Sequence, residues 1–166
     1  LGLVEGRPYA LHGAQAAGCA PVVRAWKENL DRLPLVKPST IVRSLAIGDP
    51  ADGLAAVATI KRTGGRAEEA TDPEVLECMR LLAQTEGLFA ETAGGTVVAA
   101  ARKLARAGTF DDGGRVVLLL TGHGLKTVEA LSEKPPFSTV IDGRLDEFEE
   151  FWAAQGPKGA RAHARA

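Results

Sequence analysis

The sequence has few cysteines and no clustered metal ligands. Its two cysteines, Cys19 and Cys78, are far apart and form no Cys-x-x-Cys pair. This excludes a disulfide framework and a thiolate zinc site, and it fits the reducing environment of the cytoplasm. His12, His123 and His163 are scattered and have no acidic residue at ligand spacing. The sequence therefore predicts a cytoplasmic protein without a metal site.

The chain also lacks a charge excess and a long apolar run. It has 20 basic and 21 acidic residues, which give a net charge of -1. Binding to nucleic acid or to a membrane surface requires a concentrated basic face, so neither is predicted as a partner. The clearest apolar run, Val116 to Leu120, is far shorter than the roughly 20 residues of a membrane helix. The first residues lack the basic and apolar regions of a signal peptide.

What is present is the composition of an ordinary globular domain with alternating strands and helices. Of 166 residues, 45% are hydrophobic and 25% are charged,. The alternation predicts an α/β fold with an open, mostly parallel sheet covered by helices. We expect strands at residues 7–15, 66–70, 88–91 and 116–120, and helices at 21–32, 39–46, 51–62, 71–87, 93–107 and 145–155.

Two of these elements have the strongest signals. Thr71-x-x-Glu74 has the form of a capping box, and Gly87 is a suitable C-terminal cap for the helix between them. Val116 to Leu120 is apolar without alternation. That pattern is typical of an interior parallel strand covered on both faces.

Thr121, Gly122 and Gly124 directly follow the predicted strand at 116–120. Open α/β sheets bind ligands at the carboxyl ends of their strands, and glycine lets the backbone turn sharply and approach a ligand closely. The Thr121 hydroxyl is therefore a candidate ligand-binding group. The alternative is a hydroxyl that only stabilises the turn.

Glu91 lies between a predicted strand and a predicted helix. Its carboxylate could orient a bound cofactor or exchange a proton with it. Alternatively, it could cap the helix, whose amino end favours negative charge. Gly94 and Gly95 resemble a phosphate-binding turn, but we interpret them as small residues that allow close packing of the helix on the sheet.

Five motifs in order resemble the carboxyl-terminal part of the threonine synthase family, whose members are pyridoxal-phosphate enzymes with a tryptophan-synthase-β-like fold. The motifs are LHGAQAAGCAP at residues 11–21, STIVRSLAIGDP at 39–50, TDPE at 71–74, TEGLFAETAGG at 85–95 and LTGHGLK at 120–126. The ordered series covers most of the chain up to about Thr127. It is far more specific than any one motif.

The resemblance implies a cofactor site at three residues. Thr121 would place its hydroxyl against the pyridine nitrogen of pyridoxal 5'-phosphate, with Gly122 beside it, and Glu91 would lie near the cofactor ring as a catalytic candidate. A neutral hydroxyl does not force that nitrogen to be protonated, so the ring is a more moderate electron sink. Because neighbouring parallel strands end on one rim of a sheet, we expect Glu91 and Thr121 to converge in one cleft.

The family reaction converts O-phospho-L-homoserine and water to L-threonine and phosphate. The family lysine that binds the cofactor covalently lies in a motif that none of this chain's lysines has, Lys126 included. The chain alone is therefore expected to be inactive. A threonine or serine dehydratase of the same fold, and a non-catalytic remnant or assembly module, are the alternatives.

The resemblance also guides the expected organisation. Residues 1–155 would form the carboxyl-terminal part of the family's large domain, and residues 156–166 a disordered tail. The chain begins with Leu1 rather than Met, so we expect that an amino-terminal part of a longer protein is absent. The sequence leaves a homodimer open.

Overall fold

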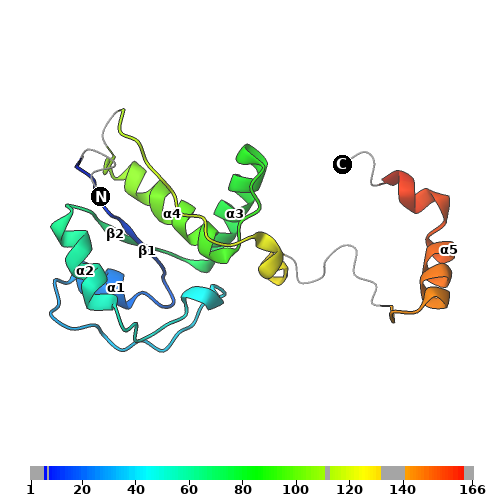
Figure 1. Ribbon diagram of the computed structural model, residues 1–166, viewed down its shortest axis with the longest axis horizontal. Helices are drawn as coiled ribbons and strands as arrows, with labels where there is room; N and C mark the ends of the chain where they lie inside the picture. The colour runs from blue at the N-terminus through cyan, green and yellow to red at the C-terminus, as the bar shows by residue number, and fades with distance from the viewer. Residues whose placement is uncertain (1–5, 7, 111–112, 132–140, 163–166) are drawn as a thin grey trace. The chain divides into compact units, whose positions relative to one another are not determined.

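The computed structural model describes residues 6, 8–110, 113–131 and 141–162. The chain divides into two compact units, Leu1–Glu133 and Lys134–Ala166. The first contains all strands and most helices of the described residues, and the second contains helix α5 (Leu145–Ala162) (Figure 1).

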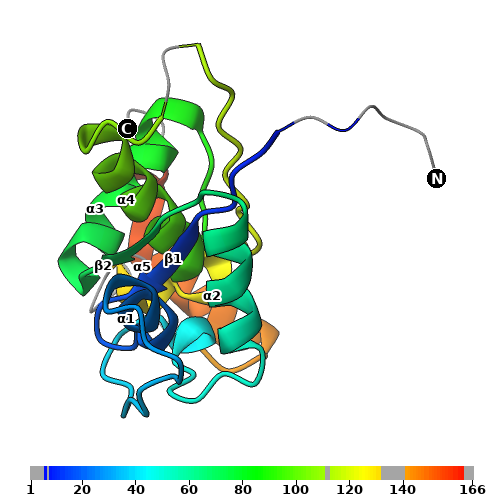
Figure 2. The ribbon, with the colours of Figure 1, turned by 90° about the vertical axis from the view of Figure 1, so that its left-hand side faces the viewer.

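The first unit is built around a two-stranded parallel sheet. Strand β1 (Gly13–Ala16) pairs with β2 (Ala67–Ala70) in a register that places Gly13 opposite Ala67 and Ala16 opposite Ala70. Helices lie on both sides of the sheet, as Figures 1 and 2 show, which confirms the predicted α/β class. The helices are α1 (Pro21–Lys27), α2 (Gly53–Arg62), α3 (Asp72–Glu86) and α4 (Thr92–Arg106).

Helices α3 and α4 pack against each other and form the main core with the sheet. The predicted capping box begins α3: the Thr71 backbone N–H donates to Glu74 Oε2 at 2.7 Å,. Gly87 ends the helix in the left-handed conformation, with a φ of 66°,. Val75 and Met79, on the inner face of α3, are fully buried.

Two predicted elements near the amino end are shorter than expected. Strand β1 begins at Gly13 rather than at residue 7, because its partner β2 has only four residues to pair with it. Helix α1 ends at Lys27 rather than near Arg32. Asn29 has a φ of 52°, a left-handed conformation that asparagine tolerates better than most residues and that interrupts a helix.

The predicted helix at 39–46 is wrong, since only a single 3₁₀ turn, Arg43–Leu45, forms there. The physical cause is the Asp72 carboxylate at the start of α3. It accepts hydrogen bonds from the Thr40 hydroxyl and from the Ile41 backbone N–H. These bonds fix the segment in a non-helical conformation and tie it to α3.

The predicted interior strand at Val116–Leu120 is also wrong in this structure. No backbone hydrogen bond joins these five residues to any other described residue. Val117 and Leu119 are each 72% exposed, whereas Leu118 is 38% exposed and Leu120 is half-buried. The segment has an inner and an outer side, but no strand or helix of the described chain covers the outer side. Burial on both faces requires such partners.

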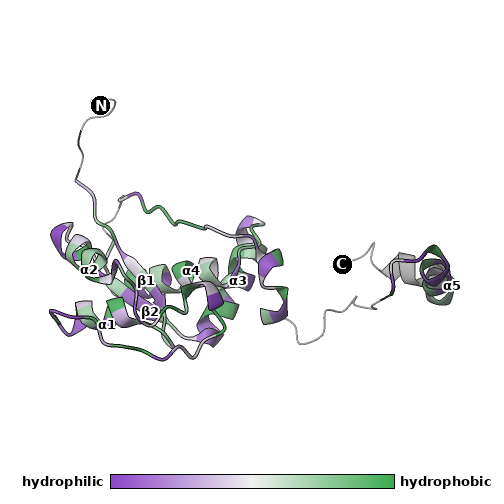
Figure 3. Cartoon of the chain, turned by 60° about the horizontal axis from the view of Figure 1, so that its bottom comes forward, coloured by the Kyte–Doolittle hydropathy of each residue, from purple (hydrophilic) through white to green (hydrophobic). Residues whose placement is uncertain are grey.

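The second unit begins at Lys134, immediately before Pro135 and Pro136. The assignment of residues 1–155 to one part of a larger domain stays a prediction. Helix α5 begins at Leu145 as predicted but extends to Ala162. The expected disorder of residues 156–166 stays a prediction, and the last four residues lie outside the described chain. Figure 3 shows both hydrophobic and hydrophilic residues on α5.

Candidate functional site

Two segments that are far apart in sequence meet at the amino end of α4. The Glu91 backbone N–H donates to the Gly122 carbonyl at 3.0 Å, and the Gly124 N–H donates to the Phe89 carbonyl at 2.8 Å. Ala90 and His123 form an isolated antiparallel bridge between these two bonds. The structure thus brings together the two segments that contain the predicted site residues.

The two segments line an open hollow of about 530 Å³, formed by residues 87–90 and 120–123. Its volume lies within the range of small-molecule pockets, roughly 300–1,000 Å³. Thr121 and Gly122 line the hollow, and so does His123. A hydroxyl and the backbone of a glycine-containing turn are suitable partners for a polar cofactor.

Glu91 is adjacent to the hollow but is not part of its lining. The residue is 7% exposed, and its carboxylate is so close to Gly122 that a side chain at that glycine would overlap Oε1 and Cδ. Among the described residues, none donates a hydrogen bond to this carboxylate.

The position of Glu91 bears on its two interpretations. Glu91 is the N-cap residue of α4, but its side chain makes no capping hydrogen bond. The structure therefore does not support the interpretation that the Glu91 side chain caps α4. The carboxylate is instead directed toward the backbone that follows Thr121, and its role toward a cofactor stays a prediction.

The two glycines of the LTGHGLK motif are required for space rather than for a positive φ. Neither Gly122 nor Gly124 has a left-handed backbone. A Cβ on Gly124 would lie 2.5 Å from two ring carbons of Phe89. The physical reason for both glycines is thus the close approach of Glu91 and Phe89, rather than the approach to a ligand that the sequence suggested. Phe89 itself was missed as a site residue, although it is the aromatic position of the TEGLFAETAGG motif.

His123 holds the turn that follows the hollow. Its Nδ1 accepts a hydrogen bond from the Leu125 N–H at 3.2 Å, at the start of the 3₁₀ turn Gly124–Lys126. The His123 ring also contacts the Phe89 ring edge to face, with centroids 5.7 Å apart,. These contacts give His123 a structural task in this turn.

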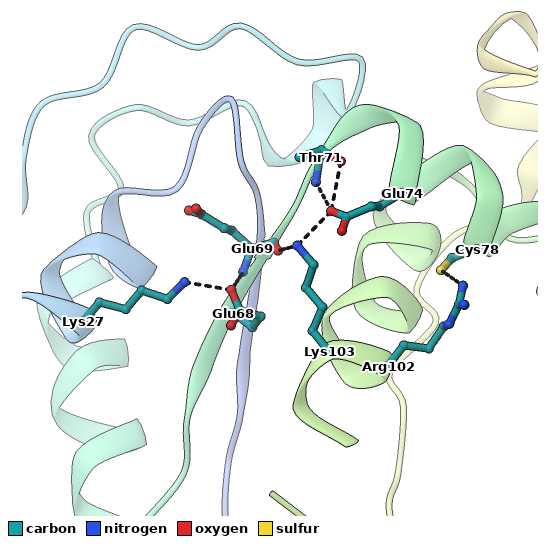
Figure 4. A network of polar contacts seen from close by, with 8 residues as sticks. All are labelled: Lys27, Glu68, Glu69, Thr71, Glu74, Cys78, Arg102 and Lys103. Carbon is teal, nitrogen blue, oxygen red and sulfur yellow. Dashed lines mark hydrogen bonds and ion pairs between the residues drawn. The ribbon is translucent and has the colours of Figure 1, made fainter. Parts of the chain in front are cut away.

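A second, smaller hollow of about 130 Å³ lies between α3 and α4, beside a polar network that the sequence did not predict (Figure 4). Lys103 donates to the Glu69 carbonyl at 2.9 Å and pairs with Glu74 at 2.8 Å. Burial raises the pKa of Glu74, but hydrogen bonds from Lys103 and Thr71 outweigh it and hold the pKa below its ordinary value,. The network joins α4 to β2 and to the start of α3, and its Lys103 and Glu74 charges pair with each other, so we interpret it as structural.

Two further observations concern other kinds of site. Within the described ranges, no three His, Cys, Asp or Glu side chains are close enough to hold a metal ion. In the same part of the chain, no helix has the length and apolar character needed to cross a membrane.

Comparison with known protein families identifies the family to which the chain belongs. Residues 1–122 match the model of the family described as "Pyridoxal-phosphate dependent enzyme". This match covers well over half of the chain, so the chain belongs to the pyridoxal-phosphate-dependent enzyme family. The segment that contains Glu91 and Thr121 lies within the matched residues.

The chain is similar to curated proteins named threonine synthase. It is 38% identical to that of Methanocaldococcus jannaschii over 138 residues, which are 81% of this chain and 34% of the relative. It is 34% identical to that of Methanosarcina acetivorans over 151 residues, 90% of this chain and 37% of the relative. The chain therefore spans little more than a third of the length of these relatives.

Among solved structures, the chain is similar to that of maize serine racemase. The TM-score is 0.46 and the sequence identity is 14%, over 55% of this chain and 28% of the racemase. A likeness at this level says nothing about function.

Proposed function

We propose that this chain is the part of a threonine synthase that supplies the pyridine-nitrogen side of the cofactor site. The complete enzyme would convert O-phospho-L-homoserine and water to L-threonine and phosphate, in the cytoplasm. The single observation that carries the proposal is the meeting of the Glu91 and Thr121 segments at one hollow, in a chain similar to relatives named threonine synthase.

The residues of the hollow fit pyridoxal 5'-phosphate in size and chemistry. When bound, this cofactor supplies an electron sink for the amino-acid substrate. Thr121 would hold the pyridine nitrogen through one hydrogen bond from or to its neutral hydroxyl, and Gly122 would let the backbone lie close to the ring. A hydroxyl contributes a net stabilisation of about 1 kcal/mol through such a bond.

Glu91 would act beside this contact. Its carboxylate lies against Gly122, the residue that follows Thr121. From there it can orient the bound cofactor or exchange a proton at an adjacent atom. The proton-exchange role requires that the carboxylate reach the hollow, which it borders.

We propose further that the 166-residue chain does not catalyse the reaction by itself. The covalent anchor of the cofactor in this family is a lysine in a motif that this sequence does not contain. Lys126, in the 3₁₀ turn beside the hollow, lacks that sequence context. Without the anchor, retention of the cofactor would depend on weak contacts such as that of Thr121.

A chimera tests the proposed function. The 138 residues of the M. jannaschii threonine synthase that align with this chain are replaced by this chain's own residues, and phosphate release from O-phospho-L-homoserine is measured. We expect an active chimera. In it, Thr121→Ser should keep most of the activity, whereas Thr121→Ala should lose about fivefold or more, the equivalent of one hydrogen bond of about 1 kcal/mol.

The chimera also separates the alternatives. A folded chimera that retains the cofactor but forms a 2-oxo acid from threonine or serine would support a dehydratase. A folded chimera that retains the cofactor and catalyses neither reaction would contradict both enzymatic proposals. For the isolated chain, we expect no cofactor absorbance change and no phosphate release. Stoichiometric binding abolished by Lys126→Ala would make Lys126 the anchor after all.

A further inference from the structure

We propose that Gly122 is a positioning residue: its lack of a side chain creates the space that the buried Glu91 carboxylate occupies. The assignment of this carboxylate to the reaction rests on the proposed function, but the steric relation between the two residues does not. It is a property of the folded chain without any cofactor.

The main observation is the overlap that a Cβ on Gly122 would produce. This atom would collide with Glu91 at Oε1 and Cδ, and it would lie 2.9 Å from Cγ. Nothing else of the described chain is among its three nearest atoms. Gly122 does not have a positive φ, so an alanine at this position would meet only this steric obstacle.

The backbone around Glu91 leaves the side chain as the part that can move. The Glu91 N–H donates to the Gly122 carbonyl at 3.0 Å, and the Glu91 carbonyl accepts from the Gly95 N–H at 3.1 Å. Both bonds fix the residue at the start of α4. A methyl group at position 122 would therefore displace the carboxylate rather than the main chain.

Phe89 and Gly124 fix the register between the two segments. A Cβ on Gly124 would lie within 2.6 Å of three atoms of the Phe89 ring. The same two residues share the 2.8 Å backbone bond from the Gly124 N–H to the Phe89 carbonyl. This contact holds Gly122 opposite Glu91 and not one residue away, where a different side chain would face the carboxylate.

The first experiment measures the surroundings of the Glu91 carboxylate directly. The full chain is labelled with ¹³C at glutamate Cδ, and the Glu91 resonance, identified by its loss in Glu91→Gln, is recorded at one fixed pH. We expect Gly122→Ala to change the chemical shift of this resonance, because the added methyl group displaces the carboxylate that now lies against residue 122. Gly6→Ala is the matched control, since no atom lies within 4 Å of that position.

The second experiment is a double-mutant cycle on thermal unfolding. We expect Gly122→Ala to lower the midpoint by about 2 °C or more in the natural sequence and by less than about 1 °C in a Glu91→Ala background, which lacks the colliding atoms. A general effect of alanine on the turn would lower the midpoint equally in both backgrounds. Equal lowering together with an unchanged Glu91 Cδ chemical shift would overturn the proposal.

Neither measurement uses the cofactor, so the two proposals can fail separately. If the chimera is inactive but the Glu91 resonance moves as expected, the proposed function fails and the positioning role stands. If the chimera is active but Glu91 does not respond to Gly122→Ala, the positioning role fails alone.

Discussion

The α3–α4 pair and the segment 116–120 both contain apolar residues that the sequence predicts to be buried, but only the pair is packed as predicted. Helix α3 carries its own start and stop signals in Thr71, Glu74 and Gly87, and its apolar face meets α4 within the same unit. The segment at 116–120 has no such partner among the described residues, and two of its residues are 72% exposed. The residues of α3 and its caps are enough to determine where this helix begins and ends. An interior strand, in contrast, forms only where neighbouring elements pair with it and cover it.

The difference between the two regions can be tested most directly by shortening one apolar side chain in each region. Met79 is fully buried and Leu119 is 72% exposed. Met79→Ala should lower the free energy of unfolding by about 3 kcal/mol because it leaves a cavity in the core. Leu119→Ala should change it by less than about 0.5 kcal/mol. Urea unfolding of both variants measures the difference, and equal losses would refute the comparison.

Gly95 gives the next largest expected effect. A Cβ at this position would lie 2.6 Å from Met79 Cγ and 2.7 Å from the Val75 carbonyl oxygen. Gly95→Ala should therefore cost about 2 kcal/mol through overpacking between the two helices, even though alanine favours a helix more than glycine does. Gly6→Ala, in open space, should have no measurable cost. A stabilised Gly95→Ala variant would show that the helices separate easily.

The fold could be predicted from the sequence where the signals are local. The capping box, the Gly87 cap and the extent of α2 to α4 follow from nearby residues. Gly94 and Gly95 do allow close packing, but their neighbours are Ala90 and Leu120 for Gly94 and helix α3 for Gly95, rather than the expected sheet. The missed elements depended on distant groups. The Asp72 carboxylate prevents a helix at 39–46.

For the candidate site, the sequence indicated which two segments to consider but not how their side chains lie. The motifs identified the two segments that meet at the hollow, since Glu91 and Thr121 each end an apolar stretch. The sequence could not predict that the Glu91 side chain lies against Gly122 rather than capping α4. That outcome depends on the bridge between Ala90 and His123, a pairing of residues more than thirty positions apart.

The polar network between α3 and α4 predicts a modest dependence on pH. The lowered pKa of Glu74 means that its charged form stabilises the fold at neutral pH. This stabilisation is fully present above the ordinary carboxyl pKa of 4.5 and is lost as the pH falls through the lower value of the folded state,. Glu74→Gln, which keeps the capping geometry, should therefore be destabilised by about 0.5 kcal/mol at neutral pH.

The measurement is urea unfolding of the natural chain and of Glu74→Gln between pH 7 and pH 3. Glu74 is 36% exposed and Lys103 33%, so solvent screens the pair and the effect stays small. The two curves should converge at the acidic end. A difference that persists there would show that the carboxylate acts through packing rather than charge.

The smallest expected effect on stability belongs to the outer side of the segment at 116–120. Val117 and Leu119 are each 72% exposed, so replacing both by lysine should leave the free energy of unfolding within about 0.5 kcal/mol of the natural value.

The same change removes part of an exposed apolar surface of the kind that promotes association. Light scattering and the fluorescence of an apolar dye should therefore both decrease in the double variant. Leu35→Lys, at a position 83% exposed elsewhere in the unit, is the control and should leave both signals nearly unchanged. If the double variant unfolds at much lower urea, Val117 and Leu119 already pack against something in solution, and the contrast between the two regions disappears.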